Sequence, residues 1–303
     1  FVPSVAVTAA ILLAVLSLAM LIYFIHHIAT RIQVSQIAAA VANEAIATID
    51  RTYPESGGGA DERGVDHPAE PRLVGQPATL RARRSGYLAD FDADALVAAG
   101  SHSDAVIRLE ARPGEWVQRD VTLFSIWPAE AATDELGAEL DRHLTLSSQR
   151  SMSQDVGFGI QQLVDIGTKA LSPGINDPTT AITCLDRLCQ ILVELGGRDD
   201  RPAGRSDDDG RLRLIAELDD WEALVSLAFD QLRHFATGIP VVTAHLVRTL
   251  NRVRVGVPAH RHPPLVAQAR AVAEGMSEIQ LAIDRSRVQR QLDAFESADT
   301  RSG

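Results

Sequence analysis

The first thirty residues of the chain contain no Asp, Glu, Lys or Arg, and residues 5–25 are almost entirely apolar. An apolar stretch of this length in one α-helix measures about 31 Å, which matches the roughly 30 Å hydrocarbon core of a bilayer. A secretory signal would instead carry a basic segment, a shorter apolar stretch and a small-residue cleavage site. The stretch here passes directly into Tyr23, Phe24, His26 and His27. The sequence therefore predicts a transmembrane helix.

The helical pattern continues beyond this span. Apolar residues recur at helical spacing from Ile28 to Ile49 without an intervening Gly or Pro, and Tyr53-Pro54 ends the pattern. We predict one transmembrane helix with a helical extension over residues 1–52, about 70 Å long. Such a rod cannot bury its own stripe of small residues. Either the extension lies on its own soluble domain, or it packs against neighbouring spans or further copies of the chain.

Composition divides the rest of the chain into three regions. Residues 53–77 contain a Gly-Gly-Gly run with mixed charges and have the composition of a flexible linker. Residues 78–130 change to the alternation of short strands and predict a small β barrel. Residues 131–303 return to helical periodicity and predict a C-terminal α-helical domain, with one edge strand over residues 211–218. The predicted fold class is a membrane α-helix followed by an α+β soluble part.

The predicted barrel has a recognisable order of elements. Gly86-Tyr87-Leu88 is followed by a capped short helix, a strand and Pro113-Gly114-Glu115-Trp116-Val117. This order resembles the biotinyl/lipoyl-type barrel that is also found in membrane-fusion adaptor proteins. No lysine occurs between Phe1 and Gln161, which excludes lipoyl or biotin attachment. The resemblance therefore implies the scaffold alone, and we predict no cofactor.

Charge and cysteine content exclude several functions. The net charge of -11 argues against nucleic-acid binding, which needs a basic surface, and an aromatic content of 5% argues against a base-stacking platform. Cys184 and Cys189 are five residues apart in a predicted helix, where they point in different directions and cannot form a disulfide with each other. No Cys/His spacing typical of zinc is present. We predict no metal site.

The densest polar segment lies between residues 149 and 180, and we interpret it as a possible ligand site or domain interface. Its candidate residues are Arg150, Gln154, Asp155, Asp165, Asn176, Asp177, Thr179 and Thr180. Arg150 and Asp155 could form a buried pair at an interface or a ligand clamp. Asp177-Pro178 has the pattern of a helix start, whose free N–H groups could also bind an anion or a partner's carbonyl group. Asp165 and Lys169 have the spacing of a surface ion pair.

His26, His27 and Arg31 lie where the span reaches the head-group region. Adjacent helical positions point about 100° apart, so both histidines of one chain cannot hold the same metal ion. If several spans cluster, one histidine of each could form a ring at a pore mouth and gate it by protonation near pH ~6.5. The simpler interpretation is hydrogen bonding to lipid or to a neighbouring helix.

Three segments carry a family resemblance. They are Tyr23-Phe24-Ile25-His26-His27-Ile28-Ala29, Gln154-Asp155-x-x-Phe158-Gly159-Ile160-x-x-Leu163-x-Asp165-Ile166 and Ala170-Leu171-Ser172-Pro173-Gly174-Ile175-Asn176-Asp177-Pro178-Thr179-Thr180-Ala181. The chain resembles, over essentially its whole length, the bacterial predicted membrane proteins of the domain of unknown function 2254 family (DUF2254). The resemblance implies that this span is the last of four, that three spans precede Phe1, and that everything after Thr30 is cytoplasmic. The family brings no established activity with it.

These observations predict an integral, multi-pass protein of the inner (plasma) membrane whose partners are the lipid bilayer and further copies of the chain. The first functional hypothesis is a homo-oligomer with a channel-like or transport-associated role and a cytoplasmic regulatory domain. The alternative is a membrane-tethered sensory module that binds a small molecule or protein without transport. The sequence shows no Ser-His-Asp, Cys-His or paired-carboxylate set, so we do not predict an enzyme.

Overall fold

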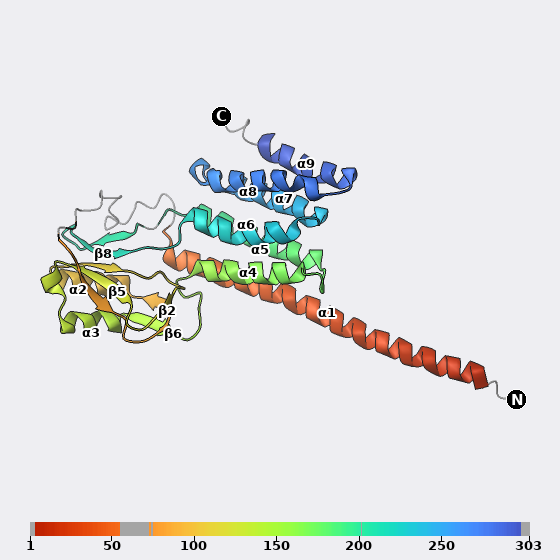
Figure 1. The fold of residues 1–303 in the computed structure, drawn as a ribbon, viewed down its shortest axis with the longest axis horizontal. Helices are drawn as coiled ribbons and strands as arrows, with labels where there is room; N and C mark the ends of the chain where they lie inside the picture. Colours follow the sequence, from red (N-terminus) through yellow and green to blue (C-terminus); the bar gives the residue numbers. More distant parts are fainter. Residues whose placement is uncertain (1–3, 55–72, 74, 201, 298–303) are drawn as a thin grey trace.

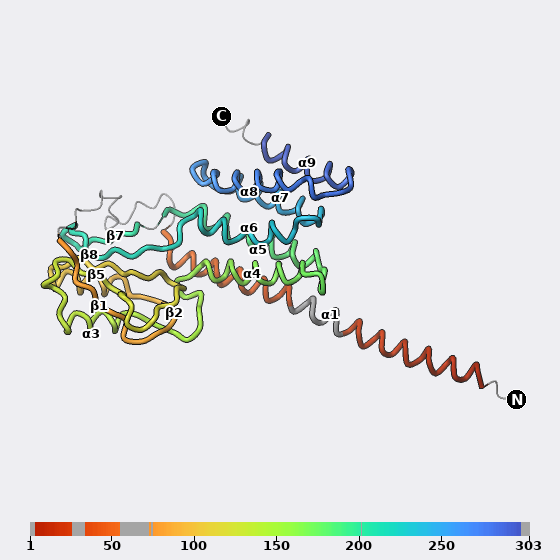
Figure 2. The backbone as a smooth tube through the Cα atoms, in the orientation of Figure 1, coloured from red at the N-terminus to blue at the C-terminus, as the bar shows by residue number. Residues whose placement is uncertain are grey.

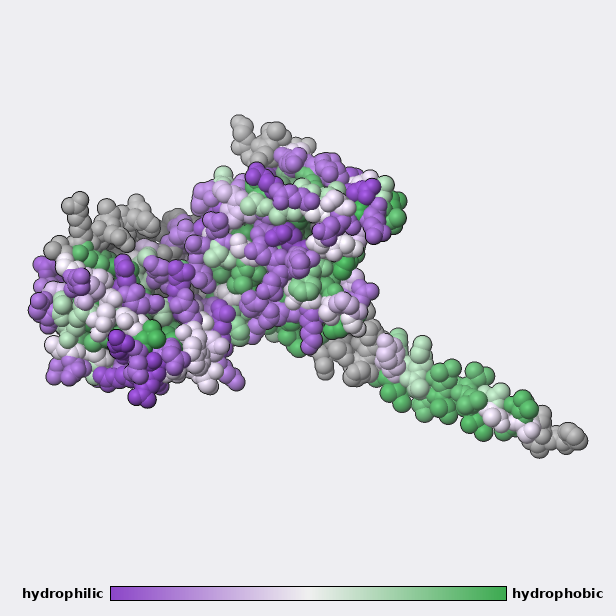
Figure 3. Space-filling model, in the orientation of Figure 1, coloured by the Kyte–Doolittle hydropathy of each residue, from purple (hydrophilic) through white to green (hydrophobic). Residues whose placement is uncertain are grey.

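The structure of the protein, a computed structural model, describes residues 4–54, 73, 75–200 and 202–297, and it leaves the side chains of residues 26–33 undescribed. Helix α1, Ser4–Thr52, runs without a break, which confirms the predicted continuous helix (Figure 1). Within the described residues, Ser4–Ile25 is the one segment long and apolar enough to cross a membrane, and none of it is buried against the rest of the chain. Its hydrophobic surface projects from the body of the molecule (Figure 3).

The second half of α1 is buried in the body of the protein. Ala38, Ala42, Ala45 and Ile49 are fully buried where α1 packs against α4, Val156–Ala170, and α5, Pro178–Gly196. These apolar residues recur every three or four positions and so form one face of the helix. Of the two interpretations of the extension, the structure therefore shows the one in which it packs on the body of its own chain.

Six helices join the extension of α1 in a bundle. After α4 and α5 come α6, Trp221–Ala236; α7, Pro240–Gly256; α8, His262–Glu274; and α9, Ala282–Ser297. Short 3-10 turns, η2 at Ala259–Arg261 and η3 at Gly275–Glu278, flank α8. The turns of the α4–α5, α6–α7 and α8–α9 hairpins lie at the same end of the bundle, the end from which α1 leaves toward its N-terminus (Figures 1 and 2).

The β part lies at the opposite end of the bundle (Figure 1). Its first sheet has the order β1-β5-β3-β8-β7, with β1 Ala78–Arg81, β5 Thr122–Trp127, β3 Val106–Leu109, β8 Leu212–Ala216 and β7 Gly204–Ser206. Its second sheet has the order β4-β2-β6, with β4 Trp116–Val117, β2 Gly86–Phe91 and β6 Leu144–Ser147. Helices α2, Ala93–His102, and α3, Asp134–Arg142, pack with the strands around a second apolar core. The pair β3–β8 is parallel, so the first sheet is mixed.

The predicted small barrel over residues 78–130 is not supported. The described strands form two open sheets, and three of those strands, β6, β7 and β8, lie beyond residue 130. The strand predicted over residues 211–218 as an edge is an inner strand, since β8 pairs with β3 on one side and with β7 on the other. These pairings are distant in sequence, and local alternation carries no information on them.

The predicted division into residues 1–52, 53–77, 78–130 and 131–303 stays a prediction. Most of the predicted linker, residues 55–72 and 74, lies outside the described part of the chain. The bundle and the sheets have separate apolar cores. Strands from residues 131–303 nevertheless complete both sheets, so the two parts are interleaved along the sequence.

Candidate functional site

Most of the polar residues predicted between positions 149 and 180 form two groups at opposite ends of α4, and Asp165 lies within the helix. Asp155 caps the start of this helix, and its side chain accepts a hydrogen bond from the backbone N–H of Phe158 at 2.9 Å. Asp177 follows the end of the helix, where its backbone N–H donates to the carbonyl oxygen of Ala170 at 2.8 Å. The 15 residues of α4 measure about 22 Å. One ligand cannot contact both groups at once unless it has that length.

Arg150 and Asp155 form a two-bond ion pair at the first of these places. Arg150 Nε and Nη2 donate to Asp155 Oδ2 and Oδ1 at 2.6 and 3.2 Å, and the Asp155 side chain is 1% exposed. The guanidinium also lies 5.3 Å from the ring centre of Phe158. Gly114 covers the pair at φ +87°, where an added Cβ would lie 2.0 Å from Asp155 Oδ2. The Pro113-Gly114 turn of the β part therefore sits directly on the cap of α4.

Gln154 makes a second connection between the β part and the bundle. Its side-chain amide donates to the carbonyl oxygen of Phe91 at 3.0 Å and accepts from the N–H of Phe91 at 3.3 Å. Phe91 is the last residue of β2. Together with the Arg150–Asp155 pair, this exchange favours the interface interpretation of these three residues over a ligand clamp.

Three charged residues that sequence reasoning missed surround this interface. Arg112 Nη2 pairs with Glu217 at 2.6 Å, and Arg112 Nη1 lies 3.7 Å from Asp219. Burial raises the pKa of the Asp219 carboxyl, the nearby Asp155 carboxylate raises it further, and Arg112 and Arg150 oppose both effects. These residues lie in loops around short strands, and their charges alone resemble an ordinary solvated surface. Only the tertiary fold shows that they meet.

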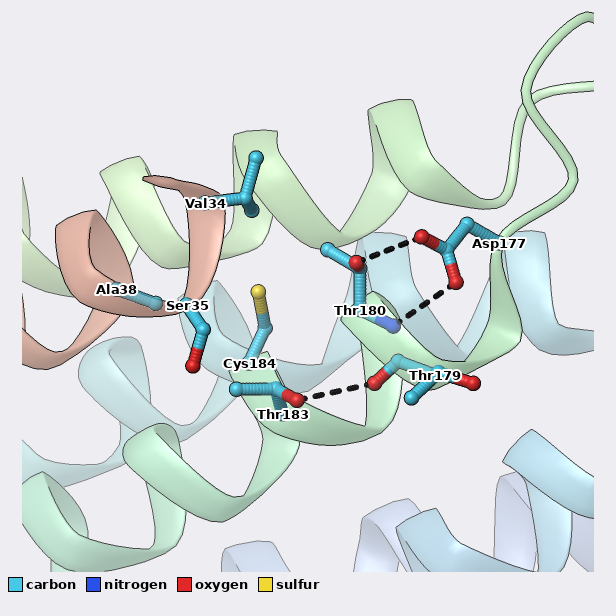
Figure 4. Close-up of a pocket in the computed structure, with 8 residues that line it drawn as sticks. All are labelled: Val34, Ser35, Ala38, Asp177, Thr179, Thr180, Thr183 and Cys184. Atoms are coloured by element: carbon cyan, nitrogen blue, oxygen red, sulfur yellow. Dashed lines mark hydrogen bonds between the residues drawn. The ribbon is translucent and has the colours of Figure 1, made fainter. Parts of the chain in front are cut away.

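The second group lines a cavity between α1 and α5 (Figure 4). The cavity has a volume of about 200 Å³. Its walls combine apolar and hydroxyl side chains with one carboxylate: Val34, Ser35, Ala38, Asp177, Thr179, Thr180, Thr183 and Cys184. The α1 residues face those of α5 across the cavity (Figure 4). It therefore lies at the end of the bundle from which α1 leaves toward the candidate span.

Asp177 is held at the edge of this cavity by the helix that it starts. Its Oδ1 accepts from the N–H of Thr180 at 3.3 Å, and its Oδ2 accepts from the Thr180 hydroxyl at 2.8 Å (Figure 4). Asn176 precedes it at φ +46°, a left-handed conformation that Asn tolerates and that turns the chain into the helix. Asp177 is 9% exposed, so its side chain lies largely inside the bundle at the edge of the cavity.

Thr183 and Cys184 complete the α5 side of the cavity. The Thr183 hydroxyl donates to the carbonyl oxygen of Thr179 at 3.0 Å, as hydroxyls inside a helix commonly do. Cys184 is fully buried, and burial raises the pKa of its thiol to about 12. The thiol is therefore neutral at physiological pH and acts as a small apolar wall. It is free, as is Cys189.

The remaining predicted residues lie elsewhere. Asn176 and Asp165 are exposed and are not among the described residues that line the cavity. Asp165 accepts a hydrogen bond from the Gln161 amide at 2.6 Å, and the described contacts include no ion pair between Asp165 and Lys169.

The predicted membrane mouth falls on the undescribed side chains. The α1 backbone passes through His26, His27 and Arg31 just after the span, but the side chains of residues 26–33 lie outside the described part of the structure. Their role stays a prediction.

The α1 wall of the cavity was also missed by sequence reasoning. Ser35 and Ala38 belong to the helix extension, whose small residues were interpreted only as a packing surface. Thr180 and Thr183 are three residues apart and so lie on one face of α5. This spacing could have identified Thr183 as a residue of the same site from the sequence. Among the described residues there is no group of three or more His, Cys, Asp or Glu side chains that could hold a metal ion. The arrangement offers hydrogen bonding and one negative charge.

Comparison with known proteins gives relatives without a stated activity. The chain is 32% identical over 257 residues to the uncharacterized protein Rv1290c of Mycobacterium tuberculosis and to the uncharacterized protein Mb1321c of Mycobacterium bovis. Each alignment covers 84% of this chain and 49% of the relative, so the chain spans about half the length of the curated relatives it matches. No solved structure matches the chain significantly.

The family comparison agrees with the membrane span and with the sequence motifs around α4 and α5. Residues 2–252 match the family described as predicted membrane protein (DUF2254), and that range includes α1, both sheets and the bundle as far as α7. The chain belongs to the DUF2254 family of predicted membrane proteins.

Proposed function

We propose that the protein is a membrane-anchored binding module whose ligand site is the cavity between α1 and α5. The observation that carries this proposal is the place of the cavity. It is walled on one side by the same helix that forms the candidate span, and on the other by the buried carboxylate and hydroxyls at the start of α5. A ligand there contacts the membrane anchor and the soluble body at once.

The lining favours a small, positively charged hydrogen-bond donor. Asp177 is the one ionisable carboxylate among the described lining residues, and Ser35, Thr179, Thr180 and Thr183 add hydroxyl oxygens. A cavity of about 200 Å³ is smaller than the roughly 300–1,000 Å³ typical of sites for drug-sized ligands. A compact ammonium compound fits both properties, because its charge pairs with the carboxylate and its N–H groups bond to hydroxyls.

The position of the cavity also suggests a sensory role. Val34 lies nine residues beyond Ile25, the end of the candidate span, or about 13 Å along the helix. A ligand that binds one packing of α1 on α5 more tightly than another shifts the protein toward that packing. Ligand binding in the cavity then changes the position of the candidate span, because the rigid helix α1 connects the two.

Thermal unfolding tests the proposal directly. The full chain in nanodiscs is titrated with methylammonium, ethylammonium, choline and potassium, and its Tm is followed. We expect a saturable rise with at least one ammonium compound in the wild type and its loss in Asp177→Asn. Asn is as good a helix cap as Asp, so this variant removes the charge while it keeps the helix start.

Asp165→Asn is the matched control, because it removes an exposed carboxylate from α4 without touching the cavity. It should respond like the wild type. Equal shifts in Asp177→Asn and the wild type, or no shift with any compound, would show that the cavity is not a site for cationic ligands.

A second candidate is the homo-oligomer with a channel-like or transport-associated role and a cytoplasmic regulatory domain. The observation in its favour is that no part of Ser4–Ile25 is buried within the described chain, so its whole surface is available to lipid or to other spans. In such an assembly His26, His27 and Arg31 would surround the inner mouth. Native mass spectrometry from nanodiscs decides this: assemblies with one defined copy number support it, and monomers alone exclude it.

We further propose that the protein is a multi-pass protein of the inner membrane with its soluble part in the cytoplasm. The support is the family's description as predicted membrane proteins together with Arg31, the first charge after the span, since basic residues favour the cytoplasmic side. Reporter fusions after Ser297 test the orientation. Fluorescence of a C-terminal green fluorescent protein supports it, and activity of a C-terminal alkaline phosphatase contradicts it.

A further inference from the structure

The membrane-facing end of the bundle exposes large apolar side chains from three separate hairpins. The exposed fractions are 53% for Ile175, 44% for Phe235, 44% for Val241, 63% for Leu281 and 72% for Ile283. Ile175 lies in the α4–α5 loop, Phe235 and Val241 flank the α6–α7 turn, and Leu281 and Ile283 lie where α9 begins. We name these five residues the apolar rim. Hydrophobic surface is visible at this end of the bundle in Figure 3.

Single exposed apolar residues are common on protein surfaces and need no explanation. The apolar rim differs because its members come from different hairpins and share one end of the molecule, the end from which α1 leaves for its span (Figure 1). Residues in tight turns are ordinarily polar. Exposed apolar residues at the same end of all three hairpins indicate that this end of the bundle is covered by an apolar partner and is not in contact with water.

The α8–α9 turn is braced in a way that holds its apolar residues outward. Arg285 Nη1 donates to the carbonyl oxygens of Ile279 and Gln280 at 2.6 and 2.9 Å. The guanidinium thus provides a hydrogen-bond donor for two backbone carbonyl oxygens of the turn, while Leu281 and Ile283 beside it remain exposed. The α6–α7 turn is held similarly, since the Thr243 hydroxyl donates to the carbonyl oxygen of Ala236 at 2.8 Å.

The length of α1 between the span and the bundle brings the apolar rim to the membrane surface. The first α1 residue at the cavity, Val34, is about 13 Å along the helix from Ile25. The head-group layer of a leaflet occupies roughly 5–8 Å of that distance. The α4–α5 loop, which carries the exposed Ile175, lies at the end of the bundle from which α1 leaves toward the candidate span (Figure 1).

We propose that the apolar rim docks on the surface of the bilayer that α1 spans, inserting its side chains between the lipid head groups. The occupant follows from continuity, because α1 connects this end of the bundle directly to the candidate span. The net charge of -11 disfavours attraction to an anionic leaflet. Docking therefore depends on apolar insertion and does not require anionic lipid. The inference is independent of the ligand proposed for the cavity.

Tryptophan quenching by brominated lipid tests this proposal on the full chain. Ile283→Trp and Leu281→Trp are reconstituted singly, one chain per nanodisc, in phosphatidylcholine brominated in the upper part of its acyl chains. Val255→Trp is the matched control, because Val255 is 73% exposed but lies at the opposite end of α7 from Val241. The three native tryptophans, Trp116, Trp127 and Trp221, lie in the β part or at the far end of α6 and give the background.

We expect both rim variants to lose emission in brominated lipid relative to unbrominated lipid, and Val255→Trp to behave like the wild type. Each substitution is at an exposed position, so folding is retained in at least one rim variant, which circular dichroism verifies. Quenching of the rim variants no greater than that of Val255→Trp overturns the proposal. A rim emission shifted to the blue without quenching overturns it as well, because protein and not lipid then covers the rim.

Discussion

The Thr48 hydroxyl donates a hydrogen bond to the carbonyl oxygen of Met152 at 2.6 Å, across 104 positions of the chain. Thr48 is fully buried on the extension of α1, and Met152 belongs to the segment that leads into α4. The helix that begins as the candidate span is thus fixed into the core of the bundle by a buried polar contact as well as by apolar packing. Movement of the span is therefore coupled to the position of α4.

Close approach of α1 and α4 depends on a glycine. An added Cβ at Gly159 would lie 2.8 Å from Met152 Sδ and 2.9 Å from Ala45 Cβ. We predict that Gly159→Ala lowers the free energy of unfolding by about 1–3 kcal/mol, as overpacking of a core does. Denaturant unfolding of the full chain in detergent measures this. Gly174→Ala is the control, since no atom lies within 4 Å of its added Cβ, and it should change stability by less than about 1 kcal/mol.

The Arg150–Asp155 pair should contribute measurably to stability because one partner is buried. Asp155→Asn keeps a capping oxygen for the Phe158 N–H but removes the charge that faces Arg150. We predict a loss of about 2 kcal/mol. Arg119→Gln breaks the exposed pair of Arg119 with Asp120 and should change stability by no more than about 0.5 kcal/mol. Equal effects of the two variants would contradict the interface described here.

Asp219 predicts a pH dependence of stability. Burial raises the pKa of this carboxyl above its ordinary value of 3.8, so the folded protein holds the proton more tightly than the unfolded chain. Stability therefore falls as pH rises from about 4 through the raised pKa. We expect Asp219→Asn to gain Tm relative to the wild type at pH 7 and to lose this advantage at pH 4. Asp120→Asn, at an exposed carboxylate, should follow the wild type at both pH values.

The buried thiol of Cys184 predicts a loss of stability in alkali. Its pKa rises from 9.0 to about 12 in the folded protein, so the unfolded chain ionises first. Stability falls as pH rises through that window, and Cys184→Ala should fall less steeply between pH 8 and 10. Mass spectrometry after iodoacetamide treatment gives a second check. The folded wild type should leave Cys184 unmodified at pH 8, and rapid modification would show that the cavity wall is open.

Local sequence signals predicted the helices well. The apolar period and the absence of Gly and Pro predicted that α1 ends near Thr52, where the structure ends it. Asp177 caps α5, as the Asp177-Pro178 pattern indicated. The sheets were predicted poorly, because β8 pairs with β3 and β6 pairs with β2 across long stretches of chain. These strands have only four to six residues and carry too little alternation to show such pairings.

Only part of the candidate site was predicted, because local sequence patterns identify some of its residues and the others meet only in the folded chain. Asp177, Thr179 and Thr180 were identified because a helix start has a local pattern, and they line the cavity. Ser35 and Ala38 were not identified, since their role exists only once α1 has docked on α5. Arg112 and Asp219 likewise come together only through the fold.

Cysteine crosslinking between α1 and the segment before α4 tests the central claim most directly. Thr48→Cys and Met152→Cys are combined in a background of Cys184→Ala and Cys189→Ala, and membranes that contain the full chain are mildly oxidised. We predict a disulfide within one chain, seen by mass spectrometry and as a shifted monomer band on a non-reducing gel. A dimer band in place of the shifted monomer, or no crosslink at all, would contradict the account, because α1 would then pack on another chain or not on the bundle.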